Sequence, residues 1–145
     1  MFEPAERASL SRARVGRLAT ADADGRPHVV PICFALVEDR LLSALDEKPQ
    51  RVDPRDLRRV RDVEENPRVA VVVDHYTESW ADLGWVQVRG TARIIEPGED
   101  GHGSAVDALR EKYPQYADHA LENRPLLEVE PGSVRSWGAL DATDG

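Results

Sequence analysis

Cysteine, lysine and long apolar runs are all scarce in this chain of 145 residues. The one cysteine, Cys33, excludes an intramolecular disulfide and a zinc site built from cysteines. No stretch approaches the roughly 20 apolar residues that span a bilayer, and the first residues lack the apolar segment of a secretory signal. We therefore expect a soluble, cytoplasmic protein with no membrane partner.

The 27 acidic residues outnumber the 19 lysines and arginines, and the positive charge is unevenly placed. The formal net charge is −8, which argues against nucleic acid as a partner. Only Lys48 and Lys112 are lysines, and residues 48–61 carry six basic and two acidic side chains, a local charge of +4. A basic island beside a helix start suits a phosphate or another small anion. An ordinary solvated arginine face explains the island equally well.

The first half of the chain predicts a helix followed by an antiparallel meander. The whole length fits one domain, 1–145, with a frayed tail over about 139–145. Pro4 suits the first turn of a helix, and the turn chemistry ending at Gly25 joins two apolar runs in a hairpin. The expected elements are a helix at 4–13 and strands at 15–21, 26–37 and 41–45.

The second half mixes helical and strand patterns. Asp53 before Pro54 is a strong helix start, and Asn66 before Pro67 ends that helix. Gly90 predicts a bulge in a long strand. The other expected elements are strands at 68–76, 85–96 and 126–137, the last interrupted at Pro131-Gly132, and a helix from Ser104 to about Tyr113. The sum is a mainly β fold with minor α content, an antiparallel barrel of about six strands.

The segment 28–37 is apolar on both faces of its expected strand. A strand on a one-sided sheet should alternate, so something covers the outer face of this one. A helix packed outside the barrel and a homodimer interface are both possible covers, and the short chain favours the homodimer.

Pro31 interrupts that apolar segment and cannot donate a hydrogen bond to a neighbouring strand. Backbone groups beside it need other partners. A plain bulge is one explanation, and the edge of a planar heterocyclic ligand is another.

Few other residues point to chemistry. Trp80 and Trp85 suit either the walls of a ligand pocket or the core, and His75 is a lone histidine near a strand end. The sequence contains no nucleotide-binding, nucleophile-elbow or metalloprotease motif, and its histidines have no close-spaced partner for a metal site. We therefore name no catalytic residue and expect no metal.

Four segments in this order resemble a known family: RLATADADGRPHVVPICFAL, LLSALDEKPQR, LRRVRDVEENPRVAVVVDHY and WADLGWVQVRGTARII. The pattern resembles the pyridoxamine 5′-phosphate oxidase-like split-barrel flavoproteins, and is closer to their actinobacterial branch that uses the deazaflavin coenzyme F420. The resemblance covers about residues 8–137. It implies a six-stranded split barrel of the FMN-binding type and a homodimer with two cofactor sites at its interface.

The resemblance also implies site residues. The backbone of the second strand would meet the edge of the cofactor ring, and the end of the third strand would border the cofactor chain. Lys48 would bind the phosphate, Arg51 would assist it, and Trp85 would reach the ring from the neighbouring side. The second-strand residues are Val30, Pro31, Ile32 and Cys33, and those of the third strand are Ser43 and Ala44.

Two departures argue against pyridoxamine phosphate oxidation. The family's Arg-x-His pair corresponds here to Arg135-Ser136-Trp137, and a second-strand arginine corresponds to Val30. The resemblance then implies an F420-dependent oxidoreductase that transfers hydride to a small organic substrate, with Val30, Ile32 and Trp85 forming an apolar pocket for the ring. An FMN-dependent reductase or oxidase and a non-catalytic carrier of F420 or flavin are the alternatives. The basic island favours F420, whose tail is the longer and more anionic.

Overall fold

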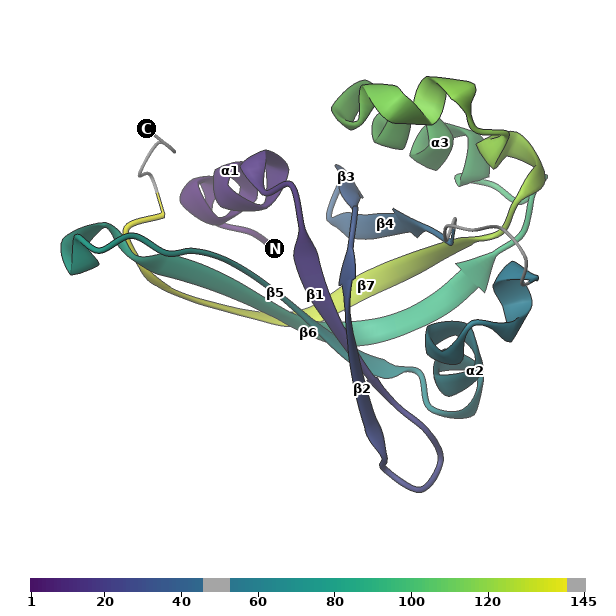
Figure 1. The fold of residues 1–145 in the computed structure, drawn as a ribbon, viewed down its shortest axis with the longest axis horizontal. Coiled ribbons are helices and arrows are strands. Elements are labelled where there is room, and N and C mark those ends of the chain that lie inside the picture. Colours follow the sequence, from purple (N-terminus) through teal and green to yellow (C-terminus); the bar gives the residue numbers. More distant parts are fainter. Residues whose placement is uncertain (46–52, 141–145) are drawn as a thin grey trace.

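The computed structural model describes residues 1–45 and 53–140, and a curled antiparallel sheet dominates it (Figure 1). No helix of these residues is long and apolar enough to span a membrane. Four 3₁₀ turns, at Pro54–Asp56, Trp80–Asp82, Pro114–Asp118 and Leu121–Asn123, accompany the main elements. The main elements are α1 (Pro4–Arg12), β1 (Gly16–Ala21), β2 (Pro27–Ile32), β3 (Ala35–Val37), β4 (Arg40–Ala44), α2 (Arg58–Glu65), β5 (Arg68–His75), β6 (Gly84–Ile95), α3 (His102–Lys112) and β7 (Leu126–Gly138).

The sheet has seven strands in the order β2-β1-β5-β6-β7-β4-β3. Six were expected, and the difference arises because the segment 26–37 forms two strands, β2 and β3, rather than one. These two strands are the opposite edges of the sheet, yet only Cys33 and Phe34 separate them along the chain. The sheet must therefore curl until its edges meet. The result is a split half-barrel with two edge strands, and not the continuous barrel without edges that strand alternation alone suggested.

Where the chain crosses this split, side chains form hydrogen bonds with the backbone groups of Cys33 and Phe34. The Tyr113 hydroxyl accepts a hydrogen bond from the Phe34 N–H at 3.1 Å, and it lies 3.1 Å from the Phe34 carbonyl and 3.0 Å from the Arg14 carbonyl, which compete for its proton. Ser43 Oγ donates to the Cys33 carbonyl at 2.8 Å. These backbone groups, which lie just after Pro31, thus find partners within the protein rather than in a ligand.

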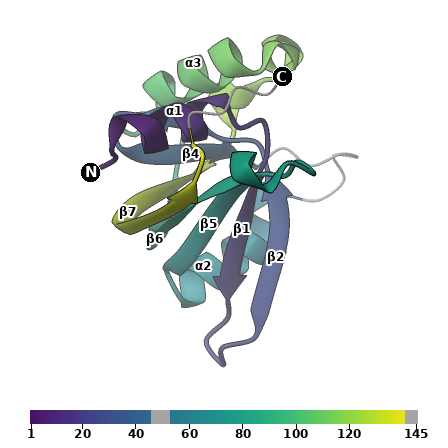
Figure 2. The same cartoon turned by 90° about the vertical axis from the view of Figure 1, so that its left-hand side faces the viewer.

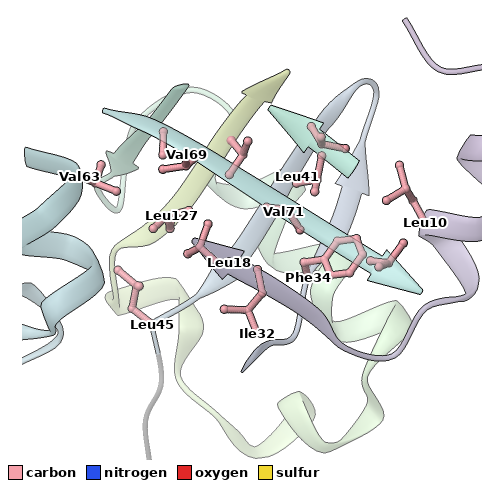
Figure 3. Close-up of a cluster of buried hydrophobic side chains, with 14 of the residues drawn as sticks. Leu10, Leu18, Ile32, Phe34, Leu41, Leu45, Val63, Val69, Val71 and Leu127 are labelled. Carbon is pink, nitrogen blue, oxygen red and sulfur yellow. The ribbon is translucent and has the colours of Figure 1, made fainter. Parts of the chain in front are cut away.

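Two apolar clusters stabilise the sheet. The larger one fills the concave side, where Leu10 from α1, Val63 from α2 and Phe34 meet side chains of β1 and β5 (Figure 3). The smaller one lies between α3 and strands β3 and β4, around the buried Leu109. All three helices therefore pack on the core side of the sheet or on its β3–β4 end.

Two helix starts differ from the sequence predictions. The helix expected from Pro54 begins as a 3₁₀ turn, with Asp53 Oδ1 accepting from the Arg55 N–H at 2.9 Å, and extended backbone at Leu57 then separates that turn from α2. The helix expected from Ser104 begins earlier, at His102, because Gly101 adopts φ +92° and its carbonyl accepts the Ala105 N–H at 3.0 Å. Glycine adopts this left-handed conformation readily.

A β-bulge lies at Gly90, as predicted, but its extra residue is Gly132 of β7, which has no partner between the pairs Arg89–Ser133 and Gly90–Pro131. The register between β6 and β7 shifts between Arg89 and Gly90, and a Cβ atom at Gly90 would lie 2.0 Å from the Glu130 carbonyl oxygen. The bulge absorbs the irregularity at Pro131, which pairs with Gly90. Strand β7 therefore continues through Pro131 and Gly132, where an interruption was expected.

Candidate functional site

The described helices leave the outer, convex face of strands β2, β1, β5, β6 and β7 uncovered. Figure 2 shows these five strands side by side in this order. Their side chains alternate between the core and this face, so that Leu18, Val71 and Val88 are fully buried while their neighbours along each strand point outward. The strand register then groups the outward residues into rows that cross the sheet.

The central row runs across all five strands. It consists of Pro31, Arg17, Val72, Gln87 and Arg135, each paired with the next on the adjacent strand. The apolar Pro31 and Val72 flank Arg17, and the polar Gln87 and Arg135 follow on β6 and β7. A planar molecule lying on this row would contact apolar surface and have hydrogen-bond donors at its edges.

A second row crosses the sheet nearer to α2 and is made mostly of small residues. It consists of Val29, Ala19, Ala70, Arg89 and Ser133. Val29 is 60% exposed although it is apolar, so this part of the sheet has no cover among the described residues. The small side chains allow another molecule to approach the backbone closely.

Beside this row lies a hollow of about 410 Å³. Its floor includes Ala19, Ala70 and Gly90, and the guanidinium-bearing residues Arg68 and Arg89 border it. Both arginines point to the outer face, since Arg68 pairs with Thr91 and Arg89 with Ala70. Within residues 1–45 and 53–140, neither has an acidic partner. Two unpaired arginines over a floor of small side chains suit an anionic group.

A third row lies at the opposite end of the face and consists of Asp74, Trp85 and Trp137. The residue before Trp137 points the other way, because Ser136 Oγ donates to Glu6 Oε2 of α1 at 2.6 Å. Trp85 and Trp137 therefore lie on the side of the sheet away from α1. Asp74 lies 3.7 Å from Arg17 of the central row, measured between the carboxylate and the guanidinium.

The four second-strand residues that the resemblance implies as site residues do not all point to this face. The side chains of Val30 and Ile32 point toward the core, and Ile32 is 6% exposed. They do not line a pocket with Trp85, which points to the opposite face, so the apolar pocket expected from these three side chains is not formed. Pro31 does point outward. Cys33 packs against the cluster beneath α3.

Strand β2 nevertheless offers backbone groups to a ligand, because it is an edge of the sheet. Proline has no N–H, so the Arg17–Pro31 pair cannot exchange two hydrogen bonds, and it occupies a non-hydrogen-bonded position of the ladder. In that register the Pro31 carbonyl and the backbone N–H and C=O of Val29 point away from β1, off the edge of the sheet. The predicted role of β2 is compatible with this arrangement through its backbone.

Of the other predicted site residues, Ser43 and Ala44 are buried, 3% and 6% exposed. Ser43 holds the Cys33 carbonyl and so fixes the end of β2 relative to β4. Lys48 and Arg51 lie outside the described residues, and their predicted phosphate contacts stay predictions.

The described part of the basic island is largely neutralised by acids from other elements. Arg55 pairs with Glu96, which raises the pKa of Arg55. Arg58 Nε lies 3.1 Å from Asp62 Oδ1, and its Nη2 lies 3.5 Å from Asp22 Oδ2. For Arg55 and Arg58, the interpretation as an ordinary arginine face therefore explains the structure better than an anion site. Arg68 and Arg89, which have no acidic partner among the described residues, lie instead on the sheet.

Sequence reasoning did not select Arg68, Arg89 or Trp137 as site residues. Alternation within 68–76 could have placed Arg68 on an outward face, since Arg68, Ala70 and Val72 lie on the same side of the strand. The lack of acidic partners depends on the tertiary structure and has no local signature. Trp80, 70% exposed, is not a core residue.

The hairpin end between β5 and β6 is organised by His75. The His75 ring nitrogen Nε2 contacts the Asp82 carbonyl, which fixes the 3₁₀ turn Trp80–Asp82 against the end of β5. This contact gives His75 a structural role. Within the described ranges, no three histidine, cysteine or acidic side chains come together in a group that could hold a metal ion.

Comparison with known proteins now adds to this geometry. A reductase of Streptomyces rimosus that acts on 5a,11a-dehydrotetracycline and 5a,11a-dehydrooxytetracycline is 31% identical over 124 residues, which are 85% of this chain and 73% of the reductase. A conserved hypothetical protein of Mycobacterium tuberculosis superposes with a TM-score of 0.75 at 21% identity, over 96% of this chain and 86% of that one.

A structure named as an F420 reductase has a TM-score of 0.66 at 24% identity and covers 93% of this chain and 98% of its own. These two structural likenesses show the fold. The family model for pyridoxamine 5′-phosphate oxidase matches residues 2–138, nearly the whole chain. The chain therefore belongs to the pyridoxamine 5′-phosphate oxidase family.

Proposed function

We propose that this protein is an F420-dependent oxidoreductase that transfers hydride between the reduced deazaflavin and a small organic substrate. Family membership and the reductase from Streptomyces rimosus support oxidoreductase chemistry. The observation that carries the choice of cofactor is the pair Arg68 and Arg89, which have no acidic partner in the described chain and border a hollow of about 410 Å³. Cations on two strands suit a long, multiply charged tail better than a single phosphate.

The described residues fit a cofactor with a flat ring and an anionic tail. The edge of β2 presents the Pro31 carbonyl and the Val29 backbone to hydrogen-bonding atoms at the rim of a ring. The alanines of the second row leave room for a chain against the sheet, and Arg68 and Arg89 supply charge-assisted hydrogen bonds. We propose that Lys48 and Arg51 bind the phosphate.

When bound, the deazaflavin supplies the hydride chemistry. The protein's own residues bind the cofactor, orient its ring and exclude water from it. Val72 and Pro31 offer apolar contact, Trp85 limits the site at the hairpin end, and the backbone of β2 sets the orientation of the ring. No side chain is needed as a nucleophile, and we name none as the proton donor.

We further propose that a second copy of the chain covers this face and completes the cofactor site. Val29, 60% exposed, adjoins Ala19 and Ala70 in one apolar patch, and contiguous apolar patches mark contact surfaces. A symmetric dimer buries such a patch against itself. Light scattering after gel filtration tests the dimer, and we expect twice the chain mass of 16.1 kDa.

The decisive experiment is a pair of titrations, F420 and FMN against the purified protein, followed by cofactor fluorescence at low and high salt. We expect F420 to bind more tightly and with the stronger salt dependence, because more charges are paired. Arg68→Gln and Arg89→Gln should each weaken F420 binding about tenfold or more, as expected for a charged hydrogen bond of roughly 1.5–3 kcal/mol. Arg61→Gln, an exposed arginine on α2, is the matched control and should leave the affinity unchanged.

Tight FMN binding with no F420 binding would instead select the FMN-dependent reductase or oxidase, which the family's flavin chemistry favours as the second candidate. Binding of F420 without oxidation of the reduced cofactor by any of a panel of quinones and nitroaromatics would select the carrier.

A further inference from the structure

All three tryptophans of the chain, Trp80, Trp85 and Trp137, lie at one end of the sheet. Trp85 and Trp137 are directly opposite each other on β6 and β7, and both point to the outer face. Trp80 lies in the turn that joins β5 to β6, at the end of the hairpin that projects at the left of Figure 1. We call these three residues the aromatic shelf.

The shelf is exposed although its side chains are the largest apolar groups available. Trp137 is 55% exposed and Trp80 is 70% exposed, whereas the core is built of aliphatic residues together with Phe34 and Tyr113. In the part of the chain that the structure describes, no aromatic partner and no hydrogen-bond partner is found for any of the three indoles. Their ring faces and N–H groups are therefore available to another molecule.

The strand that carries Trp137 is fixed beside Trp85. Gly138 adopts φ +86°, and a Cβ atom there would lie 2.1 Å from the Leu83 carbonyl oxygen. That carbonyl accepts the Ala139 N–H at 2.8 Å, so the end of β7 is held against the start of β6. A rigid pair of aromatic side chains loses little entropy when it binds a ligand.

The surroundings of the shelf indicate the ligand's chemistry. Indole faces attract flat conjugated rings, and indole N–H groups donate to carbonyl or hydroxyl oxygens. The adjoining central row ends at Arg135, a cation without an acidic partner among the described residues. A flat, fused-ring compound with oxygen substituents and a negative or neutral charge matches these groups.

We propose that the aromatic shelf binds the substrate, and that this substrate is a planar, fused-ring compound bearing oxygen substituents. That the bound compound is the substrate rests on the proposed function, because the shelf adjoins the central row on which the cofactor ring would lie. The binding of such a compound does not depend on the cofactor. The two ideas can therefore fail separately.

The test uses anthraquinone-2-sulfonate as a flat, anionic, three-ring probe and the full chain without cofactor. Because every tryptophan belongs to the shelf, intrinsic tryptophan fluorescence reports on this site alone. We expect saturable quenching, and no saturable quenching by camphorsulfonate, which carries the same charge on a ring system that is not flat. Calorimetric titration provides the dissociation constant in each variant.

Trp137→Leu and Trp80→Leu each replace an exposed side chain, and each should raise the dissociation constant of the probe at least tenfold. Ala117→Val, exposed in the turn Pro114–Asp118 beside α3 and away from the outer face, is the control and should leave it unchanged. Circular dichroism verifies that the variants are folded.

The proposal is overturned if the probe shows no saturable binding. It is also overturned if both tryptophan variants bind the probe as tightly as the unaltered protein does. It is also overturned if the variants become monomeric while the probe still binds, since the shelf would then serve contact between copies. If the probe binds the shelf but F420 and FMN do not bind the protein, the proposed function fails and the shelf remains a binding site.

Discussion

The hydroxyl of Tyr113 acts where the sheet is split, since it serves the Phe34 N–H and lies within 3.1 Å of the Phe34 carbonyl. Tyr113→Phe removes that partner and leaves buried backbone groups unsatisfied. We expect a loss of about 1–3 kcal/mol in the free energy of unfolding, measured by urea denaturation. Tyr76→Phe, 65% exposed, is the control and should cost little. Equal stability of the two variants would contradict this role of Tyr113.

Lys112 gives the fold an unusual dependence on pH. Burial, and after it the nearby Arg14, lower the pKa of Lys112 to about 8. Its Nζ lies 4.1 Å from the centre of the Phe34 ring and 3.3 Å from the Leu10 carbonyl oxygen. Between about pH 8 and the unfolded pKa of 10.5 the unfolded chain binds more protons than the folded one, so stability should rise with pH.

Burial also raises the pKa of Tyr113, which has the opposite effect above its ordinary value of 10.0. The rise in stability should therefore appear from about pH 8 to just below pH 10. Urea unfolding of the protein and of Lys112→Met across this range measures it. The variant should lose the rise, and an equal slope in both proteins would assign the effect to another group.

Among the elements, β1, α2 and the β1–β2 turn are joined through Asp62. Its carboxylate is buried, accepts from Thr20 Oγ1 at 2.8 Å, and pairs with Arg58 Nε at 3.1 Å. Arg58 in turn reaches Asp22, whose pKa is lowered chiefly by a hydrogen bond from the Arg26 backbone. This network fixes the hairpin against the helix.

Thr20→Val keeps the shape of the side chain and removes the hydroxyl, so one oxygen of the buried carboxylate loses its partner. The expected cost is about 1–3 kcal/mol, with faster hydrogen exchange in the β1–β2 hairpin. Thr91→Val, at an exposed position of β6, is the matched control. A cost no larger than that of the control would mean that the hairpin is held by apolar packing alone.

The elements that local chemistry specifies were predictable from the sequence. Pro4 starts α1, Asn66-Pro67 ends α2 and Gly90 produces a bulge, as expected. The division of 26–37 into β2 and β3 was not predictable, because its cause is distant: Phe34 is held by Tyr113, 79 residues away along the chain. Local patterns carry no information about such a partner.

The same distinction between local and distant causes applies to the candidate site. Alternation along β5 could have placed Arg68 and Ala70 on one face. Arg68 and Arg89 have no acidic partner among the described residues, while Arg55 pairs with Glu96, 41 residues away, and both facts follow only from the tertiary arrangement. The sequence pattern indicated an anion-binding group at the island 48–61, and it did not single out Arg68 and Arg89, where we propose a further one.

At the scale of the whole molecule, the outer face takes no part in the core of a single chain. A substitution on this face can therefore disturb the proposed dimer without unfolding the chain. Ala70 lies at the centre of that face, half-buried among small side chains and beside the hollow bordered by Arg68 and Arg89. Ala70→Glu places a charge where we propose that a second copy packs, and its carboxylate lies near the two arginines.

If the face is the dimer interface and the cofactor site, Ala70→Glu should yield a folded monomer that no longer binds F420. Light scattering, thermal unfolding and the F420 titration measure these three properties. Ala117→Glu, exposed in the turn Pro114–Asp118 beside α3, carries the same charge change away from the face and should remain dimeric and bind normally. A dimeric Ala70→Glu protein would place the contact between copies elsewhere, and unchanged F420 affinity would remove the hollow from the cofactor site. Because we propose that the second copy completes the cofactor site, a monomeric variant that still binds F420 would show that one chain holds the cofactor alone.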